Sequence, residues 1–230
     1  MRLYLVRHGE TDHNVARRIQ GPLLDDPLNE RGVRQAEALA RRFAAEREKG
    51  LRFAAVYSSP LKRAWMTAEA VARGAGAPAP VPVKGLTEFS WGVYLGKTET
   101  GETLEAMKAL HAQWRAGQVD AAPPGGESPA GAFRRAWDDL APVVARHAPR
   151  GDTIAWVAHG RIFKILLARL VTGDVSRMED FPQGNTAVSV LEHDAEGPYD
   201  AGWRVALLND QSHFEGLGHD TAASGPKPLV

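Results

Sequence analysis

The sequence predicts an α/β fold of three layers, in which a mainly parallel central sheet lies between helices on both faces. Three short apolar segments support this prediction, at residues 3–6, 53–57 and 153–158. Each is an unbroken apolar run that stops at turn residues, which is typical of a strand buried on both faces of a parallel sheet. Helical patterns separate the three segments, and such alternation indicates a layered α/β protein.

The helices are predicted from the spacing of apolar residues and from the residues at their ends. Four are expected near the sheet, over residues 33–44, 61–73, 129–144 and 162–171. Ser128-Pro129 is a capping residue followed by a proline suited to the first turn, and Pro142 is expected to kink that helix. Gly173 is expected to end the last helix. Two more strands are expected over residues 187–192 and 203–208.

The remaining segments set the domain organisation. Residues 74–82 are rich in Ala, Gly and Pro and are predicted as a loop. Residues 85–126, with one helix over 102–116, are predicted as an insertion that covers the active site. We expect one domain over residues 1–215 and a flexible C-terminal tail over 216–230.

Composition excludes several classes of protein. The chain has 28 Lys and Arg against 28 Asp and Glu, which argues against general binding of nucleic acid or anionic membranes. Cysteine is absent, which excludes disulfide scaffolds, thiolate metal sites and cysteine nucleophiles. No apolar run reaches the roughly 18 residues needed to cross a membrane. We expect a cytoplasmic protein whose partner is a small molecule, and a homodimer is possible.

Basic and imidazole side chains follow the predicted strands. Arg7 and His8 come directly after the first strand, Arg63 comes soon after the second, and His159 follows the third. Ligands of open α/β sheets bind beyond the carboxyl ends of the strands, and helix N-termini there favour anions. The sequence therefore predicts a phosphate site, with His8 as a nucleophile toward phosphorus.

A metal site is the alternative at this position. Glu10, Asp12 and His13 have ligating side chains, but the charge of Arg7 next to His8 would repel a cation. We therefore expect neither a metal nor a cofactor.

The run Leu5-Val6-Arg7-His8-Gly9-Glu10-Thr11, with Asn14 three residues on, resembles the signature of the histidine phosphatase superfamily, also called phosphoglycerate mutase-like. Further blocks resemble the family in the same order along nearly the whole chain. They are Gly21 with Asp26-Pro27-Leu28-Asn29-Glu30-Arg31-Gly32 and Gln35-Ala36, Ser58-Ser59-Pro60-Leu61-Lys62-Arg63-Ala64, Leu86-Thr87-Glu88, Gly125-Gly126-Glu127-Ser128, Val157-Ala158-His159-Gly160 and Asn185-Thr186. The resemblance implies the phosphoglycerate mutase-like α/β fold.

The resemblance also implies catalytic roles. His8 would attack phosphorus and become a phosphohistidine, while Arg7, Arg63 and His159 would bind the phosphoryl oxygens. Glu88 would protonate the leaving oxygen and then activate water, although Glu99, Glu102 and Glu127 are nearby competitors for that role.

Four further residues are expected to bind substrate. Asn14 would add a neutral donor to the phosphoryl pocket, with helix capping as the alternative role. Gln20 and Gly21 would line the entrance, and Gly160 would let the backbone come close to the ligand.

Hydrolysis is favoured over phosphoglycerate mutase activity, which is the alternative. In mutases of this family the acid is followed by Arg-His-Tyr-Gly-Gly, whereas Glu88 is followed by Phe89-Ser90-Trp91-Gly92. Mutases carry Asn-Ser where this chain has Arg161-Ile162, and their long proline-rich insertion is missing. We expect a pocket short of cations, which would hold the carboxylate of phosphoglycerate poorly. A binding module without catalysis would lack the nucleophile, the second histidine or the acid, and none is missing.

The substrate is expected to be a partly apolar phosphomonoester, because residues 85–126 would shape the mouth of the site. The side chains behind this expectation are Trp91, Tyr94, Lys97, Met107, Trp114 and Arg115.

Overall fold

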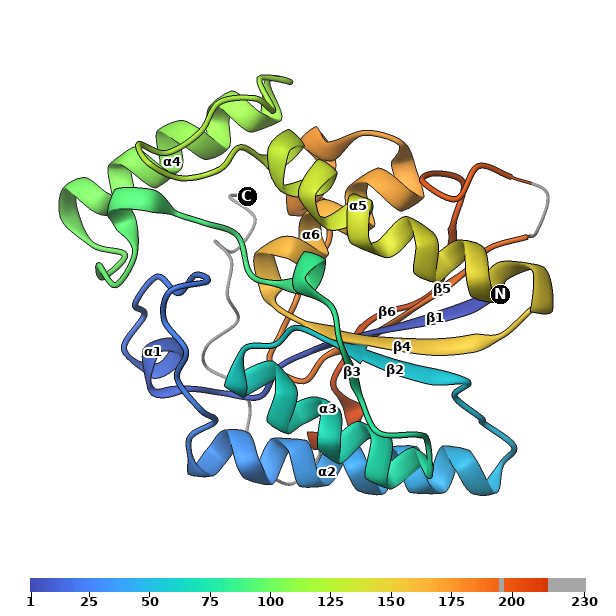
Figure 1. The fold of residues 1–230 in the computed structure, drawn as a ribbon. Coiled ribbons are helices and arrows are strands. Elements are labelled where there is room, and N and C mark those ends of the chain that lie inside the picture. Colours follow the sequence, from blue (N-terminus) through green and yellow to red (C-terminus); the bar gives the residue numbers. More distant parts are fainter. Residues whose placement is uncertain (195–196, 215–230) are drawn as a thin grey trace.

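A computed structural model describes residues 1–194 and 197–214 and contains one six-stranded sheet (Figure 1). Its strands are β1 (Arg2–Arg7), β2 (Ala55–Ser58), β3 (Val81–Pro82), β4 (Thr153–Ala158), β5 (Val188–Glu192) and β6 (Arg204–Asp210). Their order across the sheet is β3-β2-β4-β1-β5-β6. The pairs β3–β2, β2–β4 and β4–β1 are parallel, whereas β1–β5 and β5–β6 are antiparallel. The predicted mainly parallel sheet is therefore confirmed.

Helices cover both faces of the sheet. They are α1 (Asp12–Val15), α2 (Glu30–Glu48), α3 (Lys62–Ala75), α4 (Gly101–Arg115), α5 (Pro129–His147) and α6 (Gly160–Thr172). Short 3₁₀ helices lie at Lys84–Leu86, Gly92–Tyr94, Ala148–Arg150, Val175–Asp180 and Ser212–Phe214. In Figure 1, α2 and α3 lie on one side of the sheet and α5 and α6 lie on the other, which confirms the three layers.

Two of the core clusters, one on each face of the sheet, explain why the strands are apolar without interruption. Leu3 and Leu5 of β1 belong to the cluster that includes α5 and α6, whereas Tyr4 and Val6 belong to the cluster that includes α2 and α3. Side chains of a strand alternate between faces, so a strand covered by helices on both sides needs apolar residues at every position.

Helix ends follow the local sequence. The side chain of Ser128 accepts a hydrogen bond from the backbone of Gly131 at 3.1 Å and so caps α5. At Gly173 α6 ends, with a φ of 75°, a conformation that glycine adopts readily. The helix α5 continues through Pro142 to His147.

One expectation about the chain is wrong, and another concerns residues that the structure does not describe. Residues 81 and 82, inside the segment predicted as a loop, form the edge strand β3. A two-residue strand that ends in proline has no periodicity to detect, and the sheet edge tolerates its missing N–H. The tail at 216–230 lies outside the described residues, and the single domain over 1–215 stays a prediction. Within the described residues, no helix is long and apolar enough to cross a membrane.

Candidate active site

The carboxyl ends of the parallel strands meet at one edge of the sheet, on the side where α1 and α4 lie (Figure 1). His8 follows β1 and His159 follows β4, and the two strands are aligned so that Arg7 lies opposite Ala158. The imidazole rings are consequently neighbours, with centroids 5.1 Å apart and an interplanar angle of 58°. Both histidines are buried. The sequence prediction that two strands bring these rings together therefore matches the geometry.

The ring of His8 is held by its own chain. Its Nδ1 lies 2.6 Å from the carbonyl oxygen of Gly9, and a carbonyl only accepts, so Nδ1 carries the proton and Nε2 keeps its lone pair. Burial lowers the pKa of His8 well below 6.5, and the charges of Arg7 and Arg63 lower it further. The result is a neutral imidazole with one nucleophilic nitrogen.

The ring of His159 is fixed from the opposite side. Its Nε2 lies 2.8 Å from the hydroxyl of Ser59, which follows β2 and also accepts the backbone N–H of Leu61 at 3.3 Å. Its Nδ1 is buried and has no hydrogen-bond partner among the described residues. A buried polar atom without a partner costs about 1–3 kcal/mol, which binding of a ligand oxygen would offset.

Two arginines stand next to these rings, and backbone carbonyls orient both of them. Arg7 donates to Gln183 O at 2.7 Å, and Arg63 donates to Leu24 O at 2.6 Å and to Gly21 O at 3.4 Å. Arg63 is fully buried and forms no ion pair with any described residue. Burial lowers the pKa of its guanidinium from the ordinary value for arginine. The carbonyls leave the positive charge of Arg63 available, so the geometry suits an anion with several oxygens.

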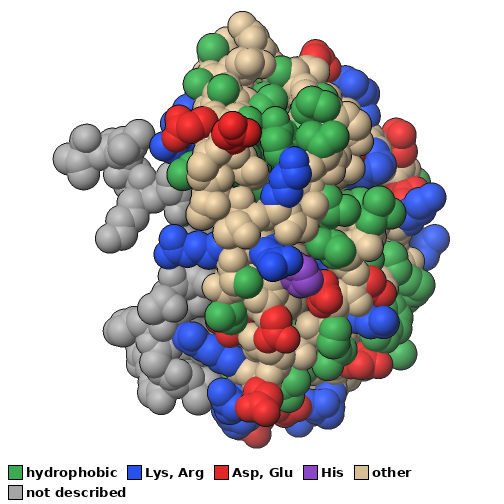
Figure 2. Space-filling view, turned by 90° about the vertical axis from the view of Figure 1, so that its left-hand side faces the viewer, with side chains coloured by type: hydrophobic (Ala, Val, Ile, Leu, Met, Phe, Trp, Pro, Cys, Tyr) green, Lys and Arg blue, Asp and Glu red, His purple; other side chains and the backbone are tan. Residues whose placement is uncertain are grey.

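A pocket of about 110 Å³ opens at this edge of the sheet. Of the predicted site residues, those lining it are Arg7, His8, Asn14, Gln20, Glu88 and Gly160. His159, Arg63 and Gly21 do not line it. Figure 2 shows the face on this side of the molecule, with one histidine near the centre beside a Lys or Arg side chain.

Asn14 fills both roles considered for it. It occupies the third position of α1, where Thr11 caps the helix and the two residues form a capping box. Its Oδ1 accepts from Thr11 N at 3.1 Å, from Thr11 Oγ1 at 3.1 Å and from Asn185 Nδ2 at 3.3 Å. With Oδ1 occupied, the amide Nδ2 is the end available to donate to a ligand.

The N-terminus of α6 approaches the site closely at Gly160. A Cβ atom there would lie 3.3 Å from Nε of Arg7, tighter than ordinary contacts. Glycine therefore lets the first turn of α6 pack against the guanidinium.

The carboxylate of Glu88 is bound by three backbone N–H groups. Oε1 accepts from Phe89 at 2.8 Å and from Ile162 at 3.0 Å, and Oε2 accepts from Arg161 at 3.3 Å. Two of these donors belong to the first turn of α6, whose N–H groups have no partner within the helix. The competing carboxylates of Glu99, Glu102 and Glu127 do not line the pocket.

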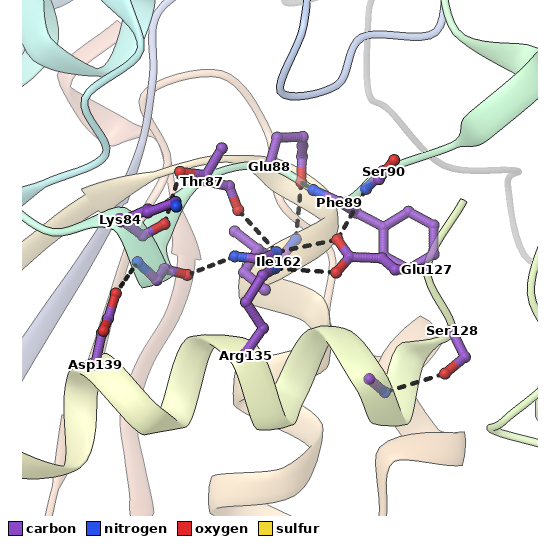
Figure 3. A network of polar contacts seen from close by, with 12 residues as sticks. Lys84, Thr87, Glu88, Phe89, Ser90, Glu127, Ser128, Arg135, Asp139 and Ile162 are labelled. Carbon is purple, nitrogen blue, oxygen red and sulfur yellow. Dashed lines mark hydrogen bonds and ion pairs between the residues drawn. The ribbon is translucent and has the colours of Figure 1, made fainter. Parts of the chain in front are cut away.

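Figure 3 shows how the segment that carries Glu88 is attached to α5. Arg135 of α5 donates to Gly85 O and to Thr87 O, each at 3.2 Å, and pairs with Glu127 at 3.0 Å. Glu127 in turn accepts the N–H of Ser90 at 2.8 Å. Arg135 thereby fixes the backbone on both sides of Glu88.

Replacing Arg135 with glutamine is expected to misplace Glu88. We expect kcat/KM for an alkyl phosphomonoester to fall about tenfold, and to fall less for p-nitrophenyl phosphate, whose leaving group needs no proton. Arg134→Gln is the matched control, since Arg134 is exposed and faces Asp120 at 3.7 Å. Equal losses on the two substrates would contradict a positioning role.

Three further charged side chains line the pocket beside Trp91, and the sequence did not identify them as site residues. They are Arg18, Arg161 and Lys164. The expectation of a pocket short of cations is therefore wrong. The expected apolar lining is also largely absent, because Met107 and Trp114 are buried in the core and Trp91 alone of the six named side chains lines this pocket. Lys164 stands between Phe163 and Ile165 in an apolar helix. A lysine in such a helix is the sequence signal that could have identified it as a site residue.

No group of three or more His, Cys, Asp or Glu side chains is gathered as a metal site within the described ranges. Glu10, considered as a ligand, accepts from Asn29 Nδ2 at 3.1 Å and lies 3.6 Å from Arg31. His13 lies 3.0 Å from Asp26. These side chains are engaged in structural contacts.

The two buried imidazoles make stability depend on pH. The pKa of His8 and of His159 is held well below 6.5, so the folded protein keeps both neutral while the unfolded chain binds protons below pH 6.5. Stability is thus present above pH 6.5 and is lost as the pH falls, by about 1.4 kcal/mol per pH unit for each histidine. Urea unfolding from pH 6.5 to 5 measures this slope. The His8→Asn variant should show a shallower slope, and parallel curves would contradict the assignment.

Known proteins resemble this chain over nearly its whole length. The family model of the histidine phosphatase superfamily (branch 1) matches residues 3–211. A metal-independent phosphoserine phosphatase of Arabidopsis thaliana is 32% identical over 94% of this chain and 84% of its own length. A probable phosphoglycerate mutase of Salmonella choleraesuis is 30% identical over 94% of this chain and 95% of its own.

A solved structure, the mycobacterial glucosyl-3-phosphoglycerate phosphatase, is similar with a TM-score of 0.74 and 30% identity. The match covers 90% of this chain and 98% of that one. The similarity therefore extends over nearly the whole of both chains.

Proposed function

Since the chain belongs to the histidine phosphatase superfamily, we propose that it hydrolyses a small phosphomonoester through a phosphohistidine at His8, without a metal ion. One observation carries the proposal. His8 is a neutral imidazole whose Nδ1 is bonded to Gly9 O, and it stands 5.1 Å from His159 beside the guanidiniums of Arg7 and Arg63.

In the first step Nε2 of His8 attacks phosphorus and the bond to the ester oxygen breaks. Protonated Glu88 gives its proton to that oxygen, and the alcohol leaves. Arg7, Arg63 and His159 bind the phosphoryl oxygens, where charge is spread in the transition state. The amide of Asn14 adds a neutral donor.

In the second step a water molecule attacks the phosphorus of the phosphohistidine. Glu88, now a carboxylate, takes a proton from the water, and the bond from phosphorus to Nε2 breaks. Inorganic phosphate leaves, and His8 and Glu88 return to their starting protonation states.

Hydrolysis is proposed over mutase activity because Phe89-Ser90-Trp91-Gly92 departs from the mutase pattern after the acid. Relatives named as phosphoserine phosphatase and glucosyl-3-phosphoglycerate phosphatase agree with this choice. Phosphoglycerate mutase activity is the second candidate, and the cations at Arg18, Arg161 and Lys164 favour it because they could hold a carboxylate.

A panel of phosphomonoesters, assayed for released phosphate with and without EDTA, tests the proposal. We expect hydrolysis at the same rate in both conditions. Incubation with 3-phosphoglycerate and a bisphosphoglycerate primer separates the alternatives, since a mutase yields the 2-phosphate isomer and a phosphatase yields free phosphate. Binding of phosphomonoesters with no turnover at all would instead indicate a binding module.

A further inference from the structure

Three cations line the pocket apart from Arg7, and we call Arg18, Arg161 and Lys164 the basic wall. All three line the pocket together with Glu88. Arg161 and Lys164 lie on α6, and Arg18 comes from the segment after α1. The basic wall is distinct from Arg7 and Arg63, which stand beside the two histidines.

The basic wall carries more positive charge than its partners neutralise. Arg161 and Lys164 share one carboxylate, that of Glu179, which lies 2.7 Å from Lys164 Nζ and also pairs with Arg161. His111, which lies 3.9 Å from Glu179, adds no charge because burial lowers its pKa to about 3.

Three more charged groups act at the basic wall: Glu99, Arg17 and Arg7, of which Arg7 acts on Lys164. Burial raises the pKa of Glu99, while Arg161, Arg17 and Lys164 oppose this rise. Glu99 and Arg17 balance each other in charge. Arg18 is exposed, and its side chain has no hydrogen bond or ion pair within the described part of the chain. The sum is a net positive charge at the mouth and side of the pocket.

The cations of α6 are held in place before any ligand arrives. The guanidinium of Arg161 lies over the ring of Trp91 at 5.2 Å and over that of Trp114 at 5.8 Å, and it contacts His111 Nε2 at 3.2 Å. Lys164 is 5% exposed, and burial lowers its pKa. Excess buried charge is unfavourable in the free protein, and an arriving anion would offset that cost.

The position of the basic wall indicates which part of a ligand it meets. Arg161 donates its backbone N–H to Glu88, the proposed acid for the leaving oxygen. Side chains next to Glu88 therefore face the leaving group. We propose that the basic wall binds a second anionic group on the leaving-group side of the substrate, an inference that rests on the proposed function.

Matched substrate pairs test the inference. O-phosphoserine and O-phosphoethanolamine differ by one carboxylate, and fructose 1,6-bisphosphate and fructose 6-phosphate differ by one phosphate. We expect kcat/KM to be at least about tenfold higher for the more anionic member of one pair, the size of effect that a charge-assisted contact gives. The pair that shows it identifies the anion as a carboxylate or a phosphate.

Substitutions in the basic wall should reduce that preference. Lys164→Met leaves Glu179 paired with Arg161, and Arg18→Gln changes an exposed side chain, so the Arg18 variant keeps the fold. Both are expected to lower the ratio of kcat/KM within the pair several-fold. Arg169→Gln is the matched control, because Arg169 lies on the same helix, pairs with Asp200 at 2.6 Å and lies over the ring of Phe133 at 5.6 Å without lining the pocket.

The outcomes separate the two proposals. The anion site is overturned if kcat/KM is equal within both pairs, or if neither variant changes the ratio of kcat/KM within a pair. In both cases hydrolysis itself still supports the proposed function. Absence of hydrolysis for every phosphomonoester overturns the proposed function itself.

Discussion

Replacing His8 with asparagine is expected to lower kcat by at least about 10³-fold, because His8 lines the pocket and the second neutral imidazole, that of His159, does not. Asparagine keeps a donor for the carbonyl of Gly9, so the fold should be retained. The measurement is steady-state hydrolysis of a phosphomonoester, together with thermal unfolding to confirm the folded state.

Labelling distinguishes loss of the nucleophile from a general loss of the site. During turnover of a ³²P-labelled substrate, the wild-type protein should carry label that is labile in acid and stable in alkali, and the His8→Asn variant should carry none. His13→Asn is the control, because His13 pairs with Asp26 and does not line the pocket. Substantial turnover by the His8 variant, or wild-type turnover without label, would show that another group accepts the phosphoryl group.

Replacing Glu88 with glutamine is expected to lower kcat/KM for an alkyl phosphomonoester by about 10²–10³-fold, the usual contribution of a general acid. The loss should be much smaller for p-nitrophenyl phosphate, because nitrophenolate leaves without a proton. The ratio kcat/KM is the informative quantity, since it reports on transfer to His8 before water reacts.

Glu102→Gln is the control for this substitution. Glu102 is one of the alternative candidates for the acid, and it is exposed on α4. It should behave as the wild type on both substrates. An equal loss on alkyl and nitrophenyl esters in the Glu88 variant would mean that Glu88 acts on binding or folding and not on the leaving oxygen.

The phosphoryl half of the site could be predicted from the sequence, because strand ends determine it. His8 and His159 each follow an apolar run, and parallel strands bring their ends to one edge of the sheet. The fold could be predicted for the same reason, since the runs and the helical spacings are local patterns. The edge strand β3 could not, because its two residues pair only through the geometry of β2.

The leaving-group half could not be predicted, because it depends on contacts between segments distant in sequence. Arg161 and Lys164 are positioned by contacts with Glu179 and His111, which lie on other elements. The same holds for Arg135, whose bonds to Gly85 and Thr87 span about fifty residues. Apart from Lys164, a lysine inside an apolar helix, these residues carry no sequence signal for such a role, and tertiary packing brings them to the site.

Glu88 is held by the backbone of residues 161 and 162 and not by their side chains. Evolution can therefore exchange the side chain at position 161, and with it the preference for one leaving group over another, while the donor that holds the acid stays in place. Proteins built on this plan can diverge in the metabolites they accept without rebuilding the chemistry, and the first turn of α6 is where such divergence would begin.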